Sequence, residues 1–144
     1  MHTRLMMVLA FGVALVPACA ARAADSKPAD KGYALAASVD PKPVGVGKPC
    51  RYALSITPAT GWQLKTATPL KVQLNAPAGL AVDKKTLTWE DLQPQQGDAK
   101  AVGTGCKGIA AGEHKLGADV TFFLCNDEIC QRHVDKIELA VRVE

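Results

Sequence analysis

Residues 115–143 read KLGADVTFFLCNDEICQRHVDKIELAVRV, and this stretch decides the fold. Apolar and polar residues alternate up to Leu124, and the alternation resumes from Val134 to Val143. A period of two is typical of a β-strand with one buried face. Two strands joined by so short a loop predict a β-hairpin, in which Cys125 and Cys130 face each other across the ladder.

The same alternation recurs along most of the chain. It is found in residues 50–57, 70–75, 86–89, 115–124 and 136–143, and a Gly-rich, strand-like run covers residues 102–109. Clusters of Pro, Gly, Asn and Asp separate these runs, and no segment has a helical stripe of useful length. About seven short strands at this spacing predict one all-β domain over residues 33–144, an immunoglobulin-like antiparallel β-sandwich.

The N-terminus has the pattern of a secretory signal peptide. Arg4 precedes an apolar run over residues 5–16, and the small-x-small triplet at residues 21–23 offers a cleavage site. The apolar run is too short to span a bilayer, so we expect residues 1–23 to be removed. Residues 24–32 are polar, and we expect them to form a disordered linker.

A second interpretation of the leader places a lipid on Cys19, because residues 16–19 (VPAC) resemble a lipobox. A periplasmic or secreted protein is the main expectation, and a lipid anchor through Cys19 is the minor alternative. No later stretch is apolar enough to cross a bilayer, so no transmembrane segment is expected in the mature chain.

The charge balance bears on the class of partner. The chain has 17 Lys and Arg and 14 Asp and Glu, and removing Arg4 and Arg22 with the leader leaves 15 − 14 = +1. No cluster of Lys or Arg stands out. Binding to nucleic acid or to an anionic membrane is therefore not expected.

Four cysteines remain once the leader is removed, namely Cys50, Cys106, Cys125 and Cys130. An even number in an exported chain favours disulfides over metal sites, and four cysteines allow three pairings. Cys50 shares the parity of the apolar residues that follow it, so we expect it to point inward. If Cys50 and Cys106 pair, the bridge closes a loop of about 57 residues, worth roughly 4 kcal/mol in chain entropy. We expect this pair to be a structural disulfide, with two buried free thiols as the alternative.

A disulfide between Cys125 and Cys130 would stabilise the fold less than one between Cys50 and Cys106. A bridge between them closes only about six residues and is worth roughly 2 kcal/mol, much of which the hairpin ladder already supplies. Cys125 also has the opposite parity to the core-facing residues before it. This parity places Cys125 off the main core or at its edge, where an exposed sulfur can be attacked by a partner's thiolate. Cys130 is on the looser, more exposed flank, and the sequence leaves open which sulfur is attacked first. From the residues alone, a redox pair and a passive staple both stay open.

Four polar residues beside this pair bear on its chemistry. Arg132 and His133 favour a thiolate whereas Asp127 and Glu128 oppose it, so no strongly activated nucleophile is expected. Cys125, Cys130 and His133 offer soft metal ligands, and Asp127 and Glu128 offer hard ones. The spacing of this set matches neither a zinc knuckle nor a haem attachment site. No metal or cofactor is therefore expected.

Four segments carry a family resemblance. They are residues 61–72 (GWQLKTATPLKV), 78–80 (AGL), 110–114 (AAGEH) and 123–130 (FLCNDEIC), of which the last is the most specific. In this order they resemble the periplasmic N-terminal domain of the thiol:disulfide interchange protein DsbD and its stand-alone relatives. The likeness covers about residues 33–143. It implies an immunoglobulin-like fold with a redox pair on the last hairpin, and only Cys125 and Cys130 correspond to the family's site residues.

The resemblance also implies partners. In that family the pair accepts electrons from a membrane-embedded partner and passes them on, so the expected partners are a membrane or periplasmic thiol–disulfide oxidoreductase and oxidised exported proteins. This chain departs from the family in having Gln131-Arg132-His133 where Pro often follows the second cysteine. It also ends at Glu144 with no electron-carrier domain, so we expect the donor to be a separate protein. Trp62 is the candidate for the family's aromatic cap loop, with packing in the core as the alternative.

Two functions remain at this point. The first is an exported relay domain that exchanges electrons through Cys125–Cys130, an activity of the protein-disulfide reductase type. The alternative is a non-enzymatic, immunoglobulin-like binding module whose disulfides only stabilise it. Such a module would recruit a partner by adding a strand to an open sheet edge.

Overall fold

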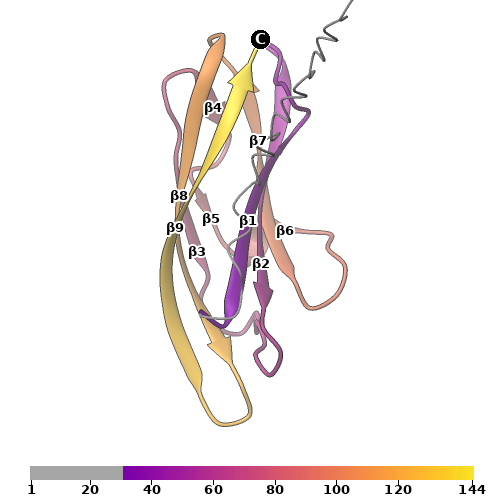
Figure 1. Ribbon diagram of the computed structural model, residues 1–144, viewed down its shortest axis with the longest axis vertical. Coiled ribbons are helices and arrows are strands. Elements are labelled where there is room, and N and C mark those ends of the chain that lie inside the picture. Colours follow the sequence, from indigo (N-terminus) through magenta and orange to yellow (C-terminus); the bar gives the residue numbers. More distant parts are fainter. Residues whose placement is uncertain (1–30) are drawn as a thin grey trace, which may run out of the picture.

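The computed structural model describes residues 31–144, which form two facing antiparallel sheets (Figure 1). The expected signal peptide and most of the expected linker lie outside the described residues. The strands are β1 (Tyr33–Asp40), β2 (Pro49–Pro58), β3 (Lys71–Asn75), β4 (Leu80–Val82), β5 (Thr86–Leu87), β6 (Leu92–Gln93), β7 (Lys100–Gly108), β8 (Gly112–Cys125) and β9 (Cys130–Val143). A 3-10 turn, η1 (Trp89–Asp91), lies between β5 and β6. Within residues 31–144, no helix has the length and apolar character needed to cross a membrane.

The strand order is that of an immunoglobulin-type sandwich. One sheet has the order β1-β2-β7-β4, with β6 also pairing β7, and the other has the order β5-β3-β8-β9. If β1, β2, β3, β7, β8 and β9 are lettered A, B, C, E, F and G, the neighbours A-B-E and C-F-G are those of an immunoglobulin domain. The fold class predicted from the alternation is confirmed.

Alternating side chains fill the space between the two sheets. The inward residues of β2 include Tyr52, Leu54 and Ile56, and those of β8 include Leu116, Val120, Phe122 and Leu124, all of them buried. Each such side chain contributes about 1.5–3 kcal/mol when it leaves water. A slip of β8 by one residue would turn this whole set toward solvent, so burial fixes the register of the β8–β9 hairpin.

The alternation does not predict β1, β4 and β6. β1 reads YALAASVD, and the small Ala and Ser residues between Tyr33 and Val39 blur the period. β4 and β6 have three and two residues, too few for a period to show. β1 pairs with β2 along its whole length and buries Tyr33 and Val39, so tertiary pairing rather than local pattern makes it a strand.

A disulfide joins Cys50 and Cys106 inside one sheet. The two residues are register partners on the adjacent strands β2 and β7, and both are buried in the core cluster. The inward orientation expected for Cys50 is confirmed. In antibody domains the disulfide connects the two sheets, whereas this one fastens two central strands of a single sheet.

Gly79 and His114 pack against each other at the end of the sandwich where β8 begins. The carbonyl of Gly79 accepts hydrogen bonds from the N–H of Ile109 at 2.9 Å and of Ala110 at 3.3 Å. The His114 ring occupies the place where a Cβ on residue 79 would stand, and its Nε2 lies 2.8 Å from the carbonyl oxygen of Ala110. A larger residue at position 79 would have to displace the His114 ring, because the backbone hydrogen bonds hold residue 79 in place.

Candidate functional site

The last register pair of the β8–β9 hairpin is Cys125 with Cys130. A disulfide joins them, their Cα atoms are 4.0 Å apart, and residues 126–129 form the loop. The hairpin extends past the rest of the sandwich, so the loop lies at one end of the molecule (Figure 1). The predicted arrangement of the two cysteines across the ladder is confirmed.

The two cysteines differ in exposure. Cys125 is 0% exposed, yet it is not part of the buried cluster that forms the core. Cys130, by contrast, is exposed. The prediction that Cys125 lies off the core, made from its parity, is therefore confirmed. The prediction that its sulfur is open to attack is wrong, because Cys125 is fully buried. Of the two cysteines, Cys130 is the one exposed to solvent.

Cys125 is covered because residues 59–64 fold against the end of β8. The N–H of Gln63 donates to the carbonyl of Cys125 at 2.8 Å, and the N–H of Cys125 donates to the carbonyl of Gln63 at 2.9 Å. This bridge occupies the edge of β8 that pairs with β3 further along the strand. Leu64, the next residue, is buried in the core and anchors the segment. Alternation along β8 does not reveal this cover, because Gln63 is remote in sequence.

Asn126 organises the hairpin loop. Its Oδ1 accepts hydrogen bonds from the N–H of Glu128 at 2.9 Å and of Ile129 at 2.8 Å. Its own N–H donates to the carbonyl of Ile129 at 2.9 Å. Asn suits this position because its short side chain reaches the backbone two and three residues ahead. Three hydrogen bonds thus hold the four residues that separate the two cysteines.

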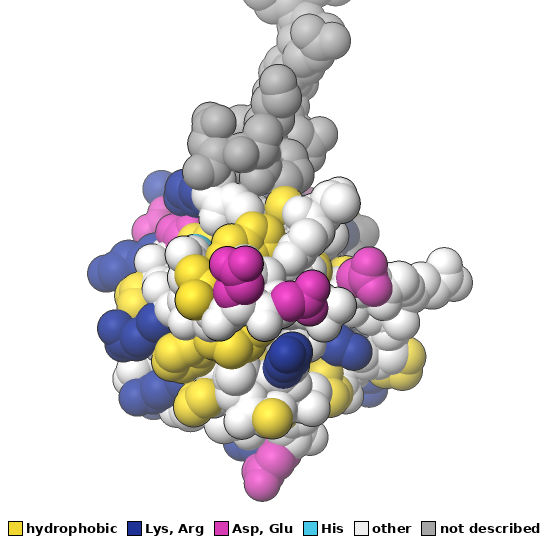
Figure 2. Space-filling model, turned by 90° about the horizontal axis from the view of Figure 1, so that it is seen from below, with side chains coloured by type: hydrophobic (Ala, Val, Ile, Leu, Met, Phe, Trp, Pro, Cys, Tyr) yellow, Lys and Arg dark blue, Asp and Glu magenta, His cyan; other side chains and the backbone are white. Residues whose placement is uncertain are grey.

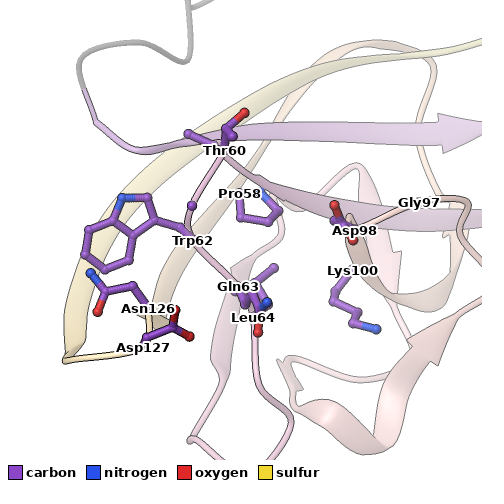
Figure 3. A pocket seen from close by; sticks show the side chains of 12 residues that line it. Pro58, Thr60, Trp62, Gln63, Leu64, Gly97, Asp98, Lys100, Asn126 and Asp127 are labelled. Atoms are coloured by element: carbon purple, nitrogen blue, oxygen red, sulfur yellow. The ribbon is translucent and has the colours of Figure 1, made fainter.

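A hollow of about 530 Å³ opens beside this loop. It is lined by residues 58–64, Gly97, Asp98, Lys100, Asn126 and Asp127. Figure 3 shows the indole of Trp62 beside Asn126 and Asp127, with Asp98 and Lys100 on the other side of the hollow. Trp62 is half-buried: it packs against the core and also lines the hollow beside the hairpin loop.

His133 lies on the opposite face of β9 from Cys130, in the seam between β1 and β9. Its ring stacks on Phe122 with 5.5 Å between centroids, and it meets Tyr33 edge-on at 5.0 Å. Burial lowers the pKa of His133 below its ordinary value of 6.5, and no group in residues 31–144 forms a hydrogen bond with its Nε2. The ring is therefore neutral near pH 7, so it adds no positive charge that would favour a thiolate.

Tyr33 and Asp135 close the same seam. The Tyr33 hydroxyl donates to Oδ2 of Asp135 at 2.9 Å, and Nζ of Lys31 donates to the same oxygen at 3.2 Å. Burial, followed by the contact with Asp135, raises the pKa of Tyr33 to about 12. Next to Lys31, the carbonyl of Gly32 accepts the N–H of Ala59 at 2.9 Å. The start of β1 thus lies beside the segment that covers Cys125.

The loop end of the hairpin presents apolar and acidic groups together. Ile129 and Val134 are 50% and 59% exposed, and Asp127 and Glu128 are exposed in the same loop. Figure 2, which views the molecule from this end, shows acidic and apolar side chains gathered near the centre of the face. A partner whose thiol reaches Cys130 would meet this mixed surface.

A disulfide with one exposed cysteine is chemically capable of thiol–disulfide exchange. Among residues 31–144, no three His, Cys, Asp or Glu side chains lie close enough together to hold a metal ion. The sequence reasoning identified both cysteines but missed Gln63 and Asn126. An Asn directly after a strand is a turn signal, so the role of Asn126 was accessible from sequence. The contact of Gln63 arises only in the folded chain.

Comparisons with known proteins add little. No family model and no curated protein matches the sequence. Among solved structures, the chain is similar to AggA, the major subunit of aggregative adherence fimbriae type I from Escherichia coli. The identity is 10%, the TM-score is 0.37, and the match covers 78% of this chain and 95% of that one. A likeness this distant has no bearing on function.

Proposed function

We propose that this chain is an exported thiol–disulfide relay domain that accepts and passes electrons through Cys125–Cys130. The observation that supports this most is the asymmetry of the pair, because Cys130 is exposed whereas Cys125 is fully covered. An outside thiolate reaches one sulfur of such a disulfide and not the other. The resemblance to the DsbD N-terminal domain, most specific over residues 123–130, points the same way.

The energetics also favour a redox role over a staple. Cys125 and Cys130 are five residues apart and already paired by the ladder, so their bridge removes little freedom from the unfolded chain. The corresponding stabilisation is roughly 2 kcal/mol at most, against roughly 4 kcal/mol for Cys50–Cys106, which are 56 residues apart. Breaking Cys125–Cys130 is therefore compatible with a folded domain.

In the first half-reaction, a thiolate of a reduced partner attacks Sγ of Cys130. The Cys125–Cys130 bond breaks, a mixed disulfide forms between the partner and Cys130, and the bond's electron pair leaves on Sγ of Cys125. A second thiolate of the partner then attacks the partner's own bridged sulfur, and Cys130 leaves as a thiolate. The partner is oxidised by two electrons, and the Cys125–Cys130 pair is reduced by two.

In the second half-reaction, the Cys130 thiolate attacks the disulfide of an oxidised exported protein and expels one of its sulfurs as a thiolate. Cys125 then attacks Sγ of Cys130, which restores the Cys125–Cys130 bond and releases the second sulfur of the substrate. Cys125 needs no access from outside for this step. Its attacking distance is set by the hairpin, whose register holds the two Cα atoms 4.0 Å apart.

Export is part of the proposal. Disulfides persist mainly in oxidising compartments, and the described chain has two of them. The leader-like pattern of residues 1–23 agrees with a periplasmic or secreted location. Mass spectrometry of the mature N-terminus distinguishes cleavage after Ala23 from a lipid on Cys19.

Single-cysteine variants test the order of exchange. In Cys125→Ser the exposed Cys130 remains, and we expect it to form a mixed disulfide with oxidised glutathione quickly and to keep it, since no second thiol resolves it. The matched control, Cys130→Ser, leaves only the covered Cys125 and should react at least tenfold more slowly. Equal rates of adduct formation in the two variants, followed by mass spectrometry, would contradict the proposal.

The competing account is a binding module with purely structural disulfides. β9 is an edge strand, as strand addition requires, but Lys136 and Glu138 are exposed on it. Its last residues are also covered by Val44, whose N–H donates to Arg142 and whose carbonyl accepts from Glu144, both at 2.9 Å. Charge and cover are the means by which proteins discourage strand addition. Mild reduction followed by alkylation separates the accounts, since the relay predicts labelling of the exposed Cys130 in the folded domain, whereas the module predicts labelling only after unfolding.

A further inference from the structure

We propose that Asn126 is a positioning residue that sets how readily the Cys125–Cys130 bond opens and closes. The inference rests on the proposed function of this pair and assigns a task to a residue that touches neither sulfur through any hydrogen bond. It follows from the hydrogen bonds of the four-residue loop and from the contrast between Asn126 and its neighbour Asp127.

All three hydrogen bonds within the loop involve Asn126. Its Oδ1 accepts from the N–H of Glu128 and Ile129, and its N–H donates to the carbonyl of Ile129, at 2.8–2.9 Å. Asp127 is exposed and its side chain makes none of the hydrogen bonds found in residues 31–144. The two adjacent side chains thus differ sharply in how much of the loop they hold.

Within the hairpin, the conformation of loop residues 126–129 is the part that the strand pairing does not fix. Cys125 is fixed on one side by its two backbone hydrogen bonds with Gln63 and on the other by the ladder to β9. Cys130 is the first residue of β9, directly after the loop, and is exposed. When the disulfide is open, the position of Cys130 relative to Cys125 therefore depends on whether residues 126–129 keep their conformation.

The step that Asn126 assists is ring closure. Sγ of Cys125, as a thiolate, attacks Sγ of Cys130 in the mixed disulfide, the Cys125–Cys130 bond forms, and the substrate sulfur leaves with the electron pair. A loop held by Asn126 keeps the two sulfurs near each other and raises their effective concentration. Without this side chain, the open form gains loop freedom that the closed form lacks, so reduction becomes easier and closure slower.

The test compares Asn126→Ala with Asp127→Ala in the full mature chain. Each protein is equilibrated with mixtures of reduced and oxidised dithiothreitol, quenched by alkylation and weighed. We expect Asn126→Ala to raise the equilibrium constant for reduction of Cys125–Cys130 about fivefold, or about 20 mV at 29.6 mV per tenfold. Asp127→Ala should change it less than twofold.

Two further variants keep the test decisive. The exchange Asn126→Asp with Asp127→Asn preserves the loop charge and returns an oxygen acceptor to position 126, so it should restore the wild-type constant within twofold. Asn126→Gln keeps the amide but moves it out of register, and it should behave like Asn126→Ala even if the latter folds poorly. Equal constants for Asn126→Ala and Asp127→Ala, or failure of the exchange to restore the constant, would overturn the inference.

The outcome is separable from that of the proposed function. The differences between variants test Asn126, whereas the absolute potential of the wild-type pair tests the relay. A very low wild-type potential together with the expected shift in Asn126→Ala would refute the relay and leave the positioning role intact.

Discussion

The two disulfides of this domain differ in their burial and in the length of chain that they close. Cys50–Cys106 joins strands β2 and β7 within the core and spans 56 residues of sequence. Cys125–Cys130 closes the end of a hairpin, spans five residues, and has one covered and one exposed cysteine. Both pairs are cross-strand register partners, so strand geometry alone does not distinguish them. Sequence separation and exposure do distinguish them, and on these two differences rests our proposal that one pair serves stability and the other serves exchange.

The comparison predicts unequal costs of removal. Replacing Cys50 and Cys106 by Ala should lower the free energy of unfolding by about 4 kcal/mol, because a long loop is freed in the unfolded chain. Replacing Cys125 and Cys130 by Ser should lower it by only about 1 kcal/mol, since the ladder already orders their short loop. Denaturant unfolding of both double variants measures this difference. Similar losses for the two pairs would break the comparison.

A substitution at the other end of the sandwich separates stability from redox behaviour. Gly79→Ala places a Cβ in the space of the His114 ring, while two hydrogen bonds hold the Gly79 carbonyl. We expect a loss of about 2–3 kcal/mol in the free energy of unfolding.

Adding His114→Ala to Gly79→Ala removes the clash and should recover at least half of that loss. The reduction potential of Cys125–Cys130, measured in the same proteins, should not change. A shifted potential would show that the hairpin end is not independent of the far end of the sandwich.

The cover over Cys125 can be loosened through Trp62. Trp62 lies in the segment that bonds to Cys125 and beside the hairpin loop, so Trp62→Ala should let reagents reach Cys125. In the reduced protein we expect alkylation of Cys125 to become about fivefold faster, with Cys130 little affected. Trp89→Ala, which removes the other, similarly half-buried Trp of the described chain, is the matched control and should leave both rates unchanged.

The smallest expected effect concerns pH and the seam beside the hairpin. Burial lowers the pKa of His133, so the unfolded chain binds its proton more tightly than the folded domain does. The contribution of neutral His133 to the free energy of unfolding should therefore be fully present above about pH 6.5. It should decrease as the pH falls from 6.5 toward 5.5, because the unfolded chain then binds a proton at this residue more readily than the folded domain does. The carboxylates with lowered pKa values, Asp91, Asp119 and Asp135, lose their contribution only nearer pH 4, outside this window.

Denaturant unfolding at pH 7.5 and 5.5 measures the contribution of His133. His133→Phe keeps a ring against Phe122 and Tyr33 and should remove most of the difference between the two pH values. An unchanged difference in this variant would assign the pH dependence to other groups.

The strong alternation in β8 and β9 allowed the hairpin, the cysteine pair and the sandwich to be predicted from sequence. Each of those features depends on neighbours close in the chain or on a simple period. The exposure of Cys125 was mispredicted for the opposite reason. Its cover comes from Gln63, a polar residue in a loop with no period, and from Leu64, whose burial appears only when the two sheets meet. β1 was missed because its Ala and Ser residues carry little pattern of their own.

The central claim is that one disulfide of this domain is built for exchange and the other for stability. The most direct test is to measure both reduction potentials in one sample of the mature protein, by redox titration and mass spectrometry of each alkylated cysteine pair. We predict that Cys125–Cys130 is reduced above about −300 mV with the fold intact, while Cys50–Cys106 stays oxidised until well below that potential. Reduction of both pairs at the same potential, or of Cys125–Cys130 only below −300 mV, would contradict the claim.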